Sequence, residues 1–78
     1  MATLGQFLSQ RRQQLRLTQQ EVGDRLRQFG VDRATPTIAH WENDRQKVPV
    51  EFIPMLAKAL ESSPVTLYEY AGVLEELP

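Results

Sequence analysis

Hydrophobic side chains recur at intervals of three and four residues along nearly the whole chain, and no segment sustains an alternation of period two. Intervals of three and four place side chains on one face of an α-helix, whereas alternation would indicate a strand. The pattern therefore predicts short helices with brief connections, which is an all-α fold. The predicted core consists of Leu4, Phe7, Leu8, Leu17, Val22, Leu26, Ile38, Trp41, Phe52, Ile53, Leu56, Leu60 and Leu67.

Capping signals mark the first two of five predicted helices. Thr3 and Thr18 are each followed three residues later by Gln or Glu, the pattern of a capping box at a helix start. Val22, Leu26 and Phe29 repeat at i, i+4 and i+7 in the second helix. We expect this helix to end near Phe29 or Gly30, because glycine accepts the left-handed backbone that commonly follows a helix.

The third helix is predicted at about 36–43. Thr35 suits its N-cap, and Pro36 suits its first helical position, where a missing N–H removes no hydrogen bond. Asn43-Asp44 is a suitable end, since both residue types tolerate left-handed geometry.

Proline also marks the last two helices. Pro54 must lie in the first turn of the fourth helix, which we therefore expect to begin near Val50 or Glu51. Ser63-Pro64 predicts the start of a fifth helix that runs to about Ala71.

The composition indicates one small domain. The chain has 78 residues and no cysteine, so it has neither a disulfide framework nor thiolate metal ligands. We expect a helical domain over 1–72 and an acidic tail over 73–78. No apolar run approaches the ~18 residues that a membrane span requires, which favours a cytoplasmic protein with no membrane partner.

The charge is unevenly distributed. The net charge is −1, but residues 1–50 hold eight Lys or Arg against five Asp or Glu, whereas 51–78 hold one against five. A mildly basic front half is what a phosphate-facing surface requires. The chain offers little to catalysis, because it has one histidine, no Gly-rich phosphate loop and no obvious carboxylate pair. We expect no enzyme activity, no metal and no cofactor.

Four pieces of the sequence, in this order, resemble the phage-repressor helix-turn-helix family of the Cro/CI or XRE type. The pieces are Leu8 with Arg12, residues 17–22, Ile38 followed by 41–43, and residues 52–60. The resemblance covers roughly Leu4 to Tyr68 and implies a five-helix repressor-like domain whose third helix enters the DNA major groove.

The chain departs from this family in one place. Between Leu26 and Ile38 it is about five residues longer than is usual in the family. We expect a second helix extended to about Phe29 or Gly30, followed by an enlarged turn that carries Arg33.

The resemblance assigns base contacts to the outer side of the third helix. Ile38 and Trp41 would face the core, so Thr37 and His40 would point away from it, and Thr35 would lie at the exposed N-terminal tip. Hydroxyl and imidazole groups can bond base edges, and methyl groups can touch the thymine methyl. The expected base contacts are Thr35, Pro36, Thr37 and His40.

Phosphate contacts are expected around the same element. Gln19 begins the second helix, where unpaired N–H groups favour anions. The other expected phosphate contacts are Arg33, Asn43, Arg45 and Lys47. The resemblance also pairs Arg12 with Glu42 in a salt bridge, which the sequence does not assign to the interior or to the surface.

Two functions stay open at this point. The first is a sequence-specific regulator of transcription, of the repressor kind, that binds double-stranded operator DNA. It would act as a homodimer on a pseudo-palindrome. The alternative is a protein-interaction module of the same fold, antitoxin-like or adaptor-like, with little DNA readout.

Overall fold

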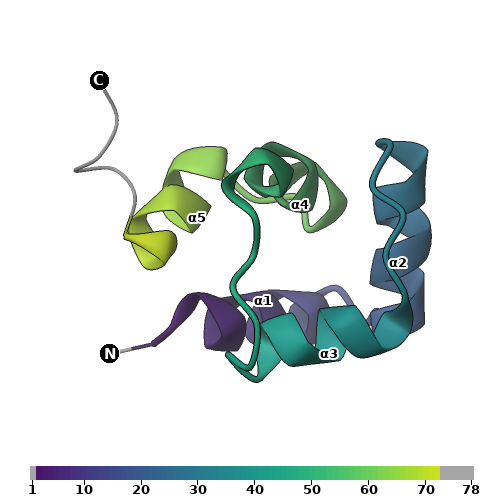
Figure 1. Ribbon diagram of the computed structural model, residues 1–78, viewed down its shortest axis with the longest axis horizontal. Coiled ribbons are helices and arrows are strands. Elements are labelled where there is room, and N and C mark those ends of the chain that lie inside the picture. The colour runs from purple at the N-terminus through teal and green to yellow at the C-terminus, as the bar shows by residue number, and fades with distance from the viewer. Residues whose placement is uncertain (1, 73–78) are drawn as a thin grey trace.

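Residues 2–72 are described by the computed structural model, and they form five α-helices without strands (Figure 1). The helices are α1 (Leu4–Gln14), α2 (Gln19–Gln28), α3 (Thr35–Glu42), α4 (Ile53–Ala59) and α5 (Pro64–Ala71), with a short 3-10 turn, η1 (Val50–Phe52), ahead of α4. The predicted all-α class is confirmed. The predicted acidic tail, 73–78, lies outside the described residues.

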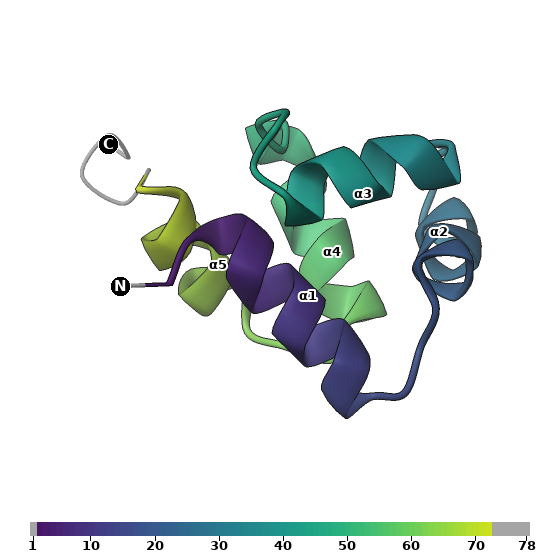
Figure 2. The same ribbon diagram turned by 90° about the horizontal axis from the view of Figure 1, so that it is seen from below.

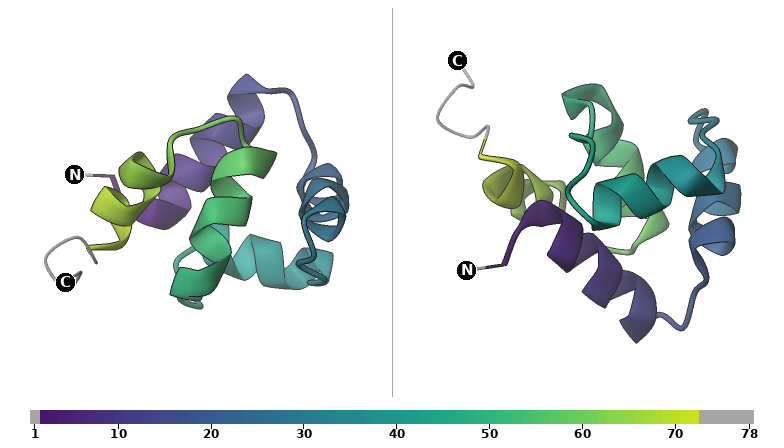
Figure 3. Two further views of the ribbon diagram at one scale, coloured as in Figure 1. Left: turned by 90° about the horizontal axis from the view of Figure 1, so that it is seen from above. Right: turned by 60° about the horizontal axis from the view of Figure 1, so that its bottom comes forward.

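The helices surround one core. Seen from below, α1 and α3 lie in front and α4 lies behind them (Figure 2). The helix α2 packs on α3 and α4 at one end of the molecule, and α5 packs on α1 and α4 at the other (Figure 3). The buried hydrophobic residues are Leu8, Val22, Leu26, Val31, Ile38, Trp41, Ile53, Leu56, Ala57, Ala59, Leu60 and Leu67. Four predicted core residues, Leu4, Phe7, Leu17 and Phe52, are only partly buried around this core.

Both predicted capping boxes are present. At α2 the hydroxyl of Thr18 accepts from the N–H of Glu21 at 3.1 Å, and the Glu21 carboxylate accepts from the N–H of Thr18 at 2.9 Å. At α1 the corresponding bonds between Thr3 and Gln6 are 3.1 and 3.0 Å. The backbone N–H of Thr18, and after it the Thr18 side chain, stabilises the charged carboxylate and so holds the pKa of Glu21 below its usual range.

The predicted cap of α3 is wrong by one residue. Ala34 is the N-cap, with the extended backbone angles φ −70° and ψ 153°, and Thr35 is already helical. The backbone carbonyl of Ala34 accepts from the N–H groups of Thr37 and Ile38, at 2.9 and 3.4 Å. An alanine side chain cannot accept a hydrogen bond, so α3 begins without a side-chain cap.

Supplying the missing cap should stabilise the protein. We expect Ala34→Ser to raise the free energy of unfolding by about 0.5–1 kcal/mol, because a serine hydroxyl at an N-cap accepts from the N–H of the third helical residue, here Thr37. Urea unfolding measures this difference. As a control, Ala39→Ser lies inside the same helix and should lower the value, since serine is the poorer helix former. An equal effect of the two substitutions would contradict a cap at position 34.

The end of α2 agrees with prediction, but the residue buried beyond it does not. The last helical residue is Gln28, and Gly30 adopts the left-handed φ of +87°. The chain reverses there, and the N–H of Val31 donates to the carbonyl of Leu26 at 2.9 Å, as in a Schellman motif. Val31 is therefore only 2% exposed, whereas Phe29, the last residue of the hydrophobic repeat, is 41% exposed.

Helical structure also begins at Val50, as predicted, but in a tighter form. The N–H of Phe52 donates to the carbonyl of Pro49 at 2.9 Å, and the N–H of Ile53 donates to that of Val50. A regular α-helix from Val50 would need an N–H at position 54, and Pro54 has none. The first turn is therefore a 3-10 turn, and α4 proper starts at Ile53.

Candidate functional site

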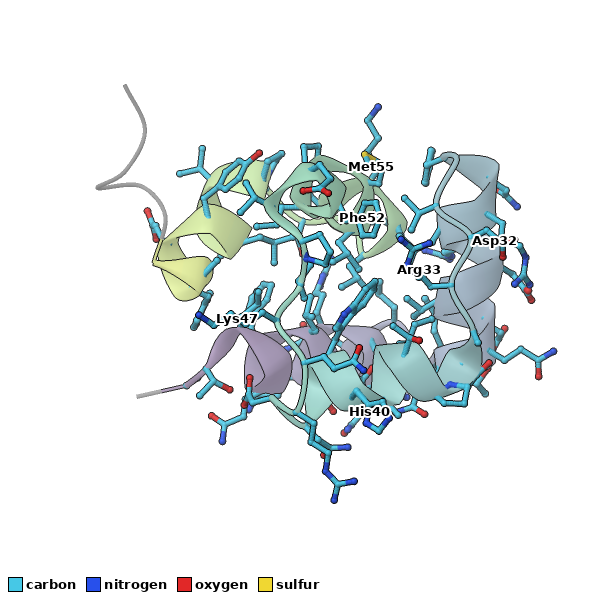
Figure 4. The ribbon with its side chains drawn as sticks, viewed as in Figure 1. Asp32, Arg33, His40, Lys47, Phe52 and Met55 are labelled. Atoms are coloured by element: carbon cyan, nitrogen blue, oxygen red, sulfur yellow. The ribbon has the colours of Figure 1, made fainter. Side chains whose placement is uncertain are left out.

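The four residues predicted to read bases all lie on α3. Thr35 and Pro36 are exposed, while Thr37 and His40 are half-buried. Figure 4 shows His40 on the side of α3 that faces away from α4. All four residues thus belong to α3, a helix of eight residues, and two of them lie at its exposed amino-terminal end.

The inner side of α3 is fixed by packing. Ile38, Trp41 and Glu42 are its buried residues. A Cβ atom added at Gly23 of α2 would lie 3.0 Å from the Ile38 side chain, so the two helices approach closely there. The ring of Trp41 lies 6.2 Å from that of Phe52, measured between centroids. These contacts set which side of α3 faces outward.

An ion pair joins α1 to α3. The guanidinium of Arg12 donates to both carboxylate oxygens of Glu42, at 2.7 and 3.0 Å, and to the carbonyl of Leu17 at 2.9 Å. The Gln19 amide donates to the same carboxylate at 3.2 Å. The side chains of Glu42 and Arg12 are only 6% and 16% exposed. The ion pair therefore lies in the interior of the protein. There, removal of one partner is costly because it leaves the other charge buried and unpaired.

The predicted phosphate contacts after α3 differ in their surroundings. The Asn43 amide donates to the carbonyl of Ala39 at 2.9 Å and so closes the helix end. The backbone N–H of Arg45 donates to the carbonyl of His40 at 2.8 Å, while its exposed guanidinium has no hydrogen-bond partner among residues 2–72. Lys47 lies on the following loop, along a surface groove (Figure 4).

Arg33, the predicted phosphate contact of the enlarged turn, faces another way. The carbon of its guanidinium lies 4.8 Å from the centroid of the Phe52 ring. One of its nitrogens donates to the carbonyl of Asp32 at 2.8 Å. Figure 4 shows Arg33 and Phe52 pointing toward each other between the turn and α4, on the opposite side of α3 from His40.

Two further arginines bind the carboxyl end of α4. Arg11 donates to the carbonyls of Leu60 and Glu61, at 2.9 and 3.1 Å. Arg25 donates to the carbonyl of Ala59 at 2.8 Å. Helix carboxyl ends carry unpaired carbonyls and partial negative charge, which these guanidinium groups satisfy. Part of the positive charge of the front half therefore has a structural role.

Sequence reasoning missed the contact that joins the start of α1 to the end of α3. The Asp44 carboxylate accepts from the Thr3 hydroxyl at 2.5 Å and from the Gly5 N–H at 3.2 Å. A Cβ atom added at Gly5 would lie 2.4 Å from the carbonyl oxygen of Trp41. Asp44 was expected only as a helix end, and its φ of +58° agrees with that. No local signal predicts a contact across 39 positions.

Comparison with known protein families gives a match over most of the chain. A family model described as a helix-turn-helix domain matches residues 3–69. Neither the curated proteins nor the solved structures contain a match to the chain. No helix in the described part of the chain has the length and apolar character to cross a membrane. Within residues 2–72 no group of three or more His, Cys, Asp or Glu side chains has the arrangement of a metal site.

Proposed function

We propose, since this chain belongs to the helix-turn-helix domain family, that it is a sequence-specific regulator of transcription whose helix α3 enters the major groove of double-stranded DNA. Members of this class bind DNA by placing the second helix of the motif against base edges. In this chain the motif is formed by α2 and α3.

The observation that carries the proposal is the contrast between the two sides of α3. Three buried residues and an internal ion pair hold its inner side. Its exposed amino-terminal end and its outer side present hydroxyl, methyl and imidazole groups, the groups that bond base edges or touch the thymine methyl. We assign the base contacts to Thr35, Pro36, Thr37 and His40.

Phosphate contacts would set the register of α3 on the duplex. We assign them to Gln19 at the start of α2 and to Asn43, Arg45 and Lys47 after α3. The exposed guanidinium of Arg45 is the best supported of these, because it has no competing partner among the described residues. Gln19 and Asn43 would each share an amide that already has an intramolecular bond.

We also propose that the protein binds DNA as a dimer. Two copies related by a two-fold axis would read half-sites one helical turn apart on a pseudo-palindromic operator, which is how compact helix-turn-helix regulators gain specificity. The protein would act as a repressor in the cytoplasm, by occupying the operator.

A protein-interaction module of the same fold is the second candidate. It is favoured by a net charge of −1 and by the use of Arg11 and Arg25 to close α4, which leaves fewer cations for phosphate. A gel-shift assay separates the two functions. Salt-sensitive binding to duplexes supports DNA recognition, and its absence with every duplex supports the interaction module.

Selection of bound sequences from a random duplex library tests the DNA reading directly. We expect a preferred half-site, and we expect His40→Ala to relax the preference at one base pair, with a loss of about 1–3 kcal/mol at that position. Arg45→Ala should weaken binding to all duplexes alike and lower the salt slope by about one. Unchanged base preferences in His40→Ala would show that this side chain does not read a base.

A further inference from the structure

The enlarged turn between α2 and α3 is held to the body of the protein at two points. Val31 is buried, and its backbone N–H donates to the carbonyl of Leu26 in α2. Arg33 lies two residues before α3, with its guanidinium over the Phe52 ring at 4.8 Å. The first contact fixes where α2 ends, and the second is the nearer to the start of α3.

The same aromatic ring also contacts the other end of α3. The Trp41 ring lies 6.2 Å from that of Phe52, measured between centroids. Trp41 is in the last turn of α3, and Arg33 immediately precedes its N-cap. Phe52 is therefore the shared support of both ends of this helix, and it stands on η1 just before α4.

The start of α3 has less local support than the starts of α1 and α2. Capping boxes fix the starts of α1 and α2, whereas α3 has no side-chain cap. Its first two backbone hydrogen bonds both end on the carbonyl of Ala34, the residue next to Arg33. A displacement of Arg33 would thus move the acceptor on which the first turn of α3 depends.

We infer that Arg33 is a positioning residue for DNA recognition. By stacking on Phe52, it fixes the amino-terminal end of α3 and therefore the placement of Thr35 and Thr37 against the bases. The inference rests on the proposed DNA-binding function and deepens it. It replaces the phosphate contact that the sequence suggests for Arg33, because the guanidinium lies on the opposite side of α3 from His40 (Figure 4).

Substitutions at the two partners separate stacking from charge. Arg33→Lys keeps the charge but lacks the planar group that stacks on an aromatic face, and Phe52→Leu keeps apolar volume but lacks the ring. We expect Arg33→Lys, Arg33→Ala and Phe52→Leu each to weaken binding to the selected duplex about two- to five-fold, the ratio that an exposed cation–π contact supplies. All three variants should show a relaxed base preference at the same base pairs. The double variant of Arg33→Ala with Phe52→Leu should bind the selected duplex only slightly more weakly than Phe52→Leu alone.

The salt dependence of binding distinguishes positioning from a phosphate contact. We expect Arg33→Ala to leave the slope of log Kd against log salt unchanged, while the control Arg45→Ala lowers it by about one. A lowered slope in Arg33→Ala, together with wild-type binding by Arg33→Lys, would overturn the inference and restore the phosphate role.

Hydrogen exchange of the free protein tests positioning without DNA. In Arg33→Ala the amides of Thr37 and Ile38 should exchange about two- to five-fold faster relative to the core amide of Leu26, which a general loss of stability would not produce. An unchanged ratio would overturn the inference. If the wild-type chain selects no duplex, the proposed function fails, and this ratio still decides whether Arg33 positions α3.

Discussion

Glu42→Ala is expected to lower the free energy of unfolding by about 3 kcal/mol, since it leaves the guanidinium of Arg12 charged and without its main partner in a mostly buried position. The carboxylate accepts three hydrogen bonds, two from Arg12 and one from Gln19. A domain of this size has a total stability of about 4–12 kcal/mol, so the loss is a large part of it. Urea unfolding followed by the fluorescence of Trp41 measures the change.

A matched control is the same change in a surface pair. Asp24 and Arg27 form an ion pair within α2 whose side chains are 50% and 48% exposed. Asp24→Ala should cost less than about 1 kcal/mol, because water solvates both groups of an exposed pair. In the double variant Arg12→Met with Glu42→Leu most of the lost stability should return, since well-packed apolar residues replace a buried ion pair at little cost. A loss as small in Glu42→Ala as in Asp24→Ala would show that the ion pair contributes no more than a surface pair.

Gly5→Ala is expected to cost about 3 kcal/mol, because the new methyl group has no space. The added Cβ atom would lie 2.4 Å from the carbonyl oxygen of Trp41 and 2.7 Å from that of Glu42. Both atoms belong to the backbone, so neither can turn aside as a flexible side chain would. The start of α1 would have to move away from the end of α3, which would also stretch the bond from Gly5 to Asp44. Thermal and urea unfolding measure the loss.

Gly23→Ala is the control for this prediction. Both glycines are buried in helices, but the nearest atom to a Cβ atom at Gly23 is the terminal methyl of Ile38, at 3.0 Å. That methyl can move by a few tenths of an ångström, and alanine favours a helix by about 1 kcal/mol relative to glycine. We expect Gly23→Ala to change stability by less than about 1 kcal/mol. Similar losses in the two variants would show that helix contacts in general, and not the backbone atoms facing Gly5, set the cost.

The elements of the fold were largely predictable because their signals are local. A capping box needs only Thr18 and Glu21, three residues apart, and the end of α2 needs only Gly30 after a hydrophobic repeat. The N-cap of α3 was misplaced by one residue because a Thr-Pro pair permits two registers, and the structure uses Ala34. Val31 was missed because its burial follows from the chain reversal at Gly30, which places it outside the helical repeat.

The pairing of Arg12 with Glu42 was predictable, while the partners of the other charged residues were not. The family resemblance joined Arg12 to Glu42 across 30 positions, and the structure brings the two together. The sequence did not indicate that Arg11 and Arg25 bind the end of α4, because the acceptors are backbone carbonyls, which every residue has. A positive charge in a sequence therefore does not reveal whether it faces phosphate or the protein itself.

The sequence by itself determined the all-α class, the order of the five helices and the small polar outer face of the third, because apolar spacing and capping are properties of neighbouring residues. Only the tertiary structure decided what holds α3 in place. Gly5 against Trp41, Asp44 against Thr3, and Arg33 against Phe52 join residues distant in the chain. Such contacts depend on how the helices pack, which no local pattern of residues specifies.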